Sequence, residues 1–61
     1  MLNDTPRLNL MIDKLYDAVS RGYIDNDWEE SFILDMHDKK VAGSPYSLKQ
    51  AAKIEELFER Y

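Results

Sequence analysis

The sequence predicts an all-α fold, a small three-helix bundle with helices over about residues 6–21, 28–41 and 48–60. Two glycines of the kind that end helices, Gly22 and Gly43, divide the chain into three segments of helix length. The outer two segments carry apolar residues at the spacing of an amphipathic helix, and strand-like alternation never persists for more than a few residues. With 61 residues there is room for one small core, so residues 1–61 are expected to form a single domain.

The first predicted helix follows an N-cap at Asp4 or Thr5, has Pro6 at its first position and ends before Gly22. One side of it is an apolar stripe that we expect to form core: Leu8, Met11, Ile12, Leu15 and Val19. Leu10 lies apart, among charged residues. It is either an ordinary exposed leucine or a contact for another chain.

The second predicted helix is apolar on two sides. Asn26 or Asp27 can cap it, with Glu29 or Glu30 completing a capping box. Its broad apolar face, which we expect mostly in the core, consists of Trp28, Phe32, Ile33 and Met36. Nearly opposite lie Leu34 and Val41. A helix of this kind is either central in the bundle or shared with a second molecule.

The third predicted helix has the clearest start in the chain. Ser47 and Gln50 form a capping box, and Pro45 just upstream cannot continue an earlier helix. One side of the helix is apolar: Ala51, Ile54, Leu57, Phe58 and Tyr61. On the other side, Glu56 and Arg60 form a favourable pair one helical turn apart.

Charge changes sign along the chain. Between residues 25 and 38 there is no Lys or Arg, and six residues are acidic: Asp25, Asp27, Glu29, Glu30, Asp35 and Asp38. Between residues 39 and 53 there is no Asp or Glu, and four residues are basic: Lys39, Lys40, Lys49 and Lys53. The basic block meets the free amides at the start of the third helix, which would suit a phosphate or carboxylate. The alternative is a solvated turn whose lysines favour the end of the second helix.

The residue types offer little catalytic or metal-binding chemistry. There is no Cys, hence no disulfide and no zinc-type spacing. Residues 25–27 begin like a calcium loop, but Glu30 stands where the turn needs Gly and Met36 where the final Glu belongs. His37 is the single histidine, and we expect it to face solvent, since one base makes no triad. We expect neither an enzyme nor a cofactor nor a bound metal.

The net charge of −4 argues against a general nucleic-acid coat, whose affinity comes from Lys and Arg. No apolar run reaches about 18 residues, so no membrane span is expected. Residues 1–4 are polar overall and do not resemble a signal peptide. Together with the lack of Cys, this predicts a cytoplasmic location.

From Trp28 onward, one order of residues is distinctive. Trp-Glu-Glu-Ser-Phe is followed by a lysine-bearing turn, by Ser-Leu-Lys-Gln at residues 47–50, and by Leu-Phe-Glu-Arg-Tyr at residues 57–61. This half of the chain resembles a helical segment of bacteriophage-encoded small proteins associated with DNA replication, repair or recombination. Ser47, Lys49 and Gln50 match that pattern, while Tyr46 stands where it has Leu. The resemblance implies a phage or mobile-element protein, which would act in the host cytoplasm.

The leading functional hypothesis is a small acidic accessory protein without catalysis, which binds and modulates a larger protein, one that processes nucleic acid. Its acidic face and aromatic anchors would make the contact: Leu10, Tyr23, Asp25, Asp27, Trp28, Glu29, Glu30 and Leu34. One alternative is direct nucleic-acid binding through the four lysines of residues 39–53. Another, compatible with the first, is a homo-oligomeric structural module.

Overall fold

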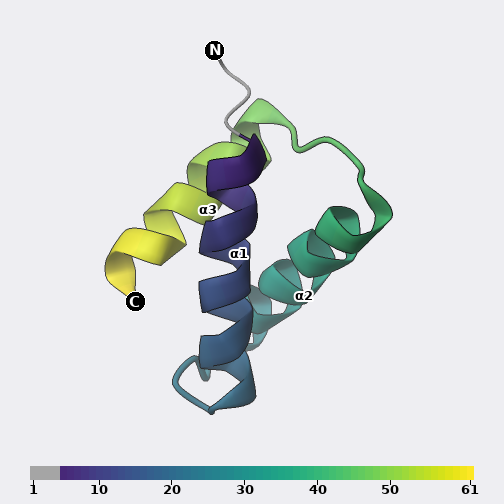
Figure 1. Ribbon diagram of the computed structural model, residues 1–61. Coiled ribbons are helices and arrows are strands. Elements are labelled where there is room, and N and C mark those ends of the chain that lie inside the picture. The colour runs from purple at the N-terminus through teal and green to yellow at the C-terminus, as the bar shows by residue number, and fades with distance from the viewer. Residues whose placement is uncertain (1–4) are drawn as a thin grey trace.

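The computed structural model describes residues 5–61, in which three helices follow one another: α1 (Thr5–Ser20), α2 (Asp27–Ala42) and α3 (Leu48–Arg60). Helix α1 lies in the middle; α2 and α3 each pack against it, and their backbones approach each other little (Figure 1). The predicted three-helix bundle is confirmed, with helix ends within one residue of expectation. Of the two predicted caps of α1, Asp4 lies outside the described residues and Thr5 is already helical.

The helix ends form as local sequence rules require. The Ser47 side chain accepts a hydrogen bond from the Gln50 amide at 3.1 Å, and the Gln50 side chain accepts one from the Ser47 amide at 3.0 Å, so the capping box is confirmed. Asn26 caps α2 by accepting from the Glu29 amide at 3.0 Å. Gly43 ends α2 with φ 76°, a left-handed conformation that residues with a Cβ adopt at a cost.

One apolar core joins the three helices. The buried residues are Leu8, Met11, Ile12 and Leu15 of α1, Ile24 of the first connection, Ile33 and Met36 of α2, and Ile54 and Leu57 of α3. The predicted stripe of the first helix is thereby confirmed, and so is that of the third helix except at Tyr61; Val19, Ala51 and Phe58 are half-buried at the edges. Tyr61 follows the last residue of α3 and is 50% exposed, so its expected place on the apolar side is wrong. The second helix is different. Ile33 and Met36 enter the core, but Trp28 is 58% exposed, so its expected place in the core is wrong.

Polar side chains close the α1–α2 side of the bundle. The Tyr46 hydroxyl donates a hydrogen bond of 2.6 Å to Asn9 Oδ1, which ties the second connection to α1. The imidazole of His37 is half-buried and stacks on the ring of Tyr16, with 3.9 Å between ring centroids. The expectation that His37 faces solvent is therefore wrong, because a tyrosine of α1 covers one face of its ring.

None of the helices within residues 5–61 is both long enough and apolar enough to cross a membrane.

Candidate interaction surface

The connection between α1 and α2 presents aromatic and acidic side chains outward. Ile24 is 3% exposed and anchors the connection in the core, whereas Tyr23 on one side of it is 69% exposed and Asp25 on the other is exposed. With Ile24 buried, the side chains of both its neighbours lie on the outside of the connection. Asp27 and Trp28 at the start of α2 continue the exposed run. We call Tyr23, Asp25, Asp27 and Trp28 the acidic aromatic edge.

Trp28 is exposed but held in place. Its ring stacks on Phe32, one turn later in α2, with 5.4 Å between centroids and 8° between planes. The ammonium of Lys53 lies 5.2 Å from the Trp28 ring centroid, a cation–π contact that reaches across from α3. A side chain that is already ordered loses little entropy when it binds, so Trp28 is a preorganised anchor.

Glu29, expected on the partner-binding face, is only 5% exposed and is occupied within the chain. Arg60 and Tyr61 at the end of α3 both bind its carboxylate, Tyr61 by a hydrogen bond of 2.6 Å. The Glu29 charge raises the pKa of Arg60, and the hydrogen bond to Glu29 raises the pKa of Tyr61. Glu29 therefore leaves the set of exposed acids, and it completes no capping box because its carboxylate turns toward α3.

The remaining residues of the predicted surface do not extend the edge. Glu30 is half-buried. Leu34 is 40% exposed, but six positions beyond Trp28 it points to a different side of α2. Leu10 is 64% exposed and lies on α1, away from the core stripe of that helix. Only four of the eight predicted residues thus belong to the acidic aromatic edge around the start of α2.

The four lysines of the predicted phosphate seat have different surroundings. Lys40 pairs with Asp13 of α1 at 3.0 Å, and Lys53 pairs with Glu56 at 3.3 Å while it contacts Trp28. Lys39 is half-buried, and Lys49 is exposed in the first turn of α3. Two of the four cations are therefore already neutralised within the chain. Among residues 5–61, no three His, Cys, Asp or Glu side chains gather as a metal site would require.

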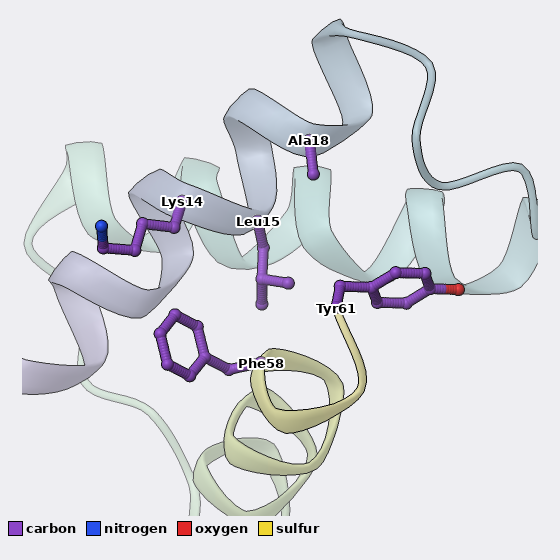
Figure 2. A pocket seen from close by; sticks show the side chains of 5 residues that line it. All are labelled: Lys14, Leu15, Ala18, Phe58 and Tyr61. Atoms are coloured by element: carbon purple, nitrogen blue, oxygen red, sulfur yellow. The ribbon is translucent and has the colours of Figure 1, made fainter.

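A groove that sequence reasoning missed lies between α1 and α3. It has a volume of about 220 Å³ and is lined by Lys14, Leu15, Ala18, Phe58 and Tyr61 (Figure 2). The available signal was Ala18, a small residue between the larger apolar residues of α1, which leaves a gap where two helices pack. Lys14 lies next to Asp13 in the sequence, and nothing in that pattern marks it as part of a groove.

Comparison of the chain with protein-family models, with curated proteins and with solved structures gave no match. The resemblance of residues 28–61 to phage-encoded proteins stays a prediction.

Proposed function

We propose that this chain is a non-catalytic interaction protein that binds and modulates a larger protein through the acidic aromatic edge. The observation that carries the proposal is the exposure of both edge aromatics, Tyr23 at 69% and Trp28 at 58%, in a domain too small to spare large apolar side chains from its core. Exposed aromatic side chains of this size are typical anchors of protein interfaces.

The charge of the edge defines the partner. Asp25 and Asp27 lie between the two anchors in the sequence, and neither takes part in an ion pair within the part of the chain that the structure describes. A matching partner presents cationic residues around an apolar pocket. Basic grooves that hold nucleic acid have this chemistry, and an acidic edge with fixed aromatics can occupy one, with attraction between the charges speeding the encounter. The resemblance to phage-encoded proteins of DNA metabolism supports the same class of partner.

Affinity capture from a host-cell lysate tests the proposal when matched variants are compared. The wild-type protein and Val41→Ser, which changes a 71% exposed residue of α2 outside the edge, should retain the same partner. Trp28→Ser and the double variant Asp25→Lys/Asp27→Lys should lose it. Helix content, measured by circular dichroism, should be equal in all four proteins, because each substitution lies at an exposed position.

The purified partner then gives a quantitative test. Trp28→Ser should weaken binding by more than about tenfold, the effect of removing an interface anchor. The association rate should fall as salt is raised, since exposed charges steer the encounter. A partner bound equally well by wild type and by Trp28→Ser would contradict the proposed surface, and so would the absence of any specific partner.

A further inference from the structure

The α1–α3 groove has an apolar floor and one cationic end. Figure 2 shows the Leu15 and Phe58 side chains facing the same space, with Lys14 at one end and Tyr61 at the other. Lys14 is exposed and makes no ion pair within residues 5–61. A cavity of roughly 150 Å³ holds a benzene ring, so the groove volume of about 220 Å³ suits one aromatic side chain. A fitting occupant therefore combines an aromatic ring with a nearby carboxylate.

The chain itself carries such an occupant. Tyr23 and Asp25 both point outward because Ile24 between them is buried. Asp25 is two residues from Tyr23, and two residues span at most about 7 Å of chain, so its carboxylate stays within reach of a long lysine side chain at the end of the groove. The Tyr23 ring does not line the groove of its own chain.

We propose that this groove binds Tyr23 of a second copy of the chain, and that Asp25 of that copy pairs with Lys14. The ring of Tyr23 covers Leu15, Ala18 and Phe58, and the carboxylate neutralises the cation at the end of the groove. The argument rests on size and charge complementarity between two features of one molecule.

The position of the two features favours a reciprocal dimer. The backbone amide of Tyr23 donates a hydrogen bond of 2.9 Å to the carbonyl of Ala18, so the inserted residue and the groove adjoin in each copy. Two molecules can therefore exchange Tyr23 about a two-fold axis and fill both grooves. The contact is small, below the roughly 1,200 Å² of standard interfaces, and the dimer is accordingly weak and concentration-dependent.

Sedimentation equilibrium of the pure protein, from about 20 µM to 2 mM, tests the inference. The wild-type protein should shift from monomer to dimer across this range. Tyr23→Ala should raise the dissociation constant about 100-fold, because the dimer contains two such contacts. Ala18→Leu should also prevent dimerisation by filling the groove, while it keeps the fold, since the added atoms enter open space.

A charge exchange identifies the pairing. Lys14→Glu and Asp25→Lys should each raise the dissociation constant about tenfold, because each places like charges together twice in the dimer. The double variant Lys14→Glu/Asp25→Lys should recover dimerisation. The matched control is Lys49→Glu, an exposed lysine on α3 away from the groove, which should dimerise like wild type.

A monomer throughout the concentration range would overturn the inference. The inference would also be overturned if Tyr23→Ala left the dissociation constant of the dimer unchanged. The same holds if the double variant Lys14→Glu/Asp25→Lys dimerised no better than the two single variants. The measurement needs no other protein, so its outcome is independent of whether the proposed partner is found.

Discussion

Tyr61 donates a hydrogen bond of 2.6 Å to the carboxylate of Glu29, which lies 32 residues earlier at the start of α2. Arg60 binds the other oxygen of the same carboxylate. The backbones of α2 and α3 have little contact of their own, so these side chains, together with Lys53 over Trp28, add direct contacts between two helices that also share the apolar core. A buried carboxylate thus holds the end of α3.

Glu29→Ala should lower the free energy of unfolding by about 1–2 kcal/mol, because the buried carboxylate loses both partners and α3 loses its tie to α2. Urea denaturation measures this change. Glu30→Ala is the matched control, since it removes an acid from the same helical turn without those partners, and it should cost clearly less. If both variants lost the same free energy of unfolding, the effect of Glu29 would come only from its charge near the N-terminus of α2 and not from Arg60 and Tyr61.

Stability should fall at alkaline pH, and Tyr46 should contribute to the fall. Burial raises the pKa of Tyr46 above its ordinary value, and the nearby Asp13 carboxylate adds to the effect. Above pH 10 or so, the unfolded chain releases the phenol proton while the folded chain keeps it, so stability decreases as pH rises through the folded pKa and is fully present below the unfolded pKa.

Tyr46→Phe tests this contribution. At neutral pH the variant should lose about 1 kcal/mol with the hydrogen bond to Asn9. Its stability should then decline less steeply than that of wild type above about pH 10. Some decline should remain, because the pKa of Tyr61 is also raised by its hydrogen bond to Glu29. Parallel curves for the two proteins would exclude a role for Tyr46.

Ile33→Ala should cost at least about 2 kcal/mol, the range of large-to-small changes in a core. Ile33 is 1% exposed, and a domain of this size rarely holds more than about 5 kcal/mol in total. The variant should therefore unfold at much lower urea concentration. Val41→Ala, at a 71% exposed position of the same helix, should stay within about 0.5 kcal/mol of wild type.

Gly43→Ala should destabilise the protein by about 1–2 kcal/mol through the backbone alone. An added Cβ would meet no atom within 4 Å, so steric contact contributes nothing, whereas the φ of 76° is strained for alanine. Gly43→Asn should cost less, because asparagine adopts the left-handed conformation more readily. Thermal denaturation of the two variants distinguishes strain from crowding.

The features predictable from the sequence are those that depend on neighbours a few residues away. The capping box of Ser47 and Gln50, the glycine at the end of α2 and the stripe of Leu8 to Leu15 all follow from local spacing, and all are confirmed. Local rules also misled. Glu29 stands where a capping box would use it, and Trp28 is one turn from a helix face that enters the core.

The missed features depend on residues far apart in the chain. Nothing near Glu29 in sequence indicates that Arg60 and Tyr61 bind it, and nothing near His37 indicates that Tyr16 covers its ring. The groove is of the same kind, since it needs Ala18 of α1 and Phe58 of α3 at the same place. The periodicity of apolar residues shows which side of each helix is buried, but it does not show which residues of the other helices that side contacts.

The central position of α1 has a consequence for the folding reaction. The α1–α2 contacts of Tyr16 with His37 and of Asp13 with Lys40 close shorter stretches of chain than the Arg7–Glu55 ion pair of α1 and α3, which closes 48 residues and requires a larger loss of chain entropy. An α1–α2 hairpin should therefore assemble first and α3 should dock last. In hydrogen-exchange experiments, the amides of α3 should then lose protection before those of α1, by partial opening of the native protein.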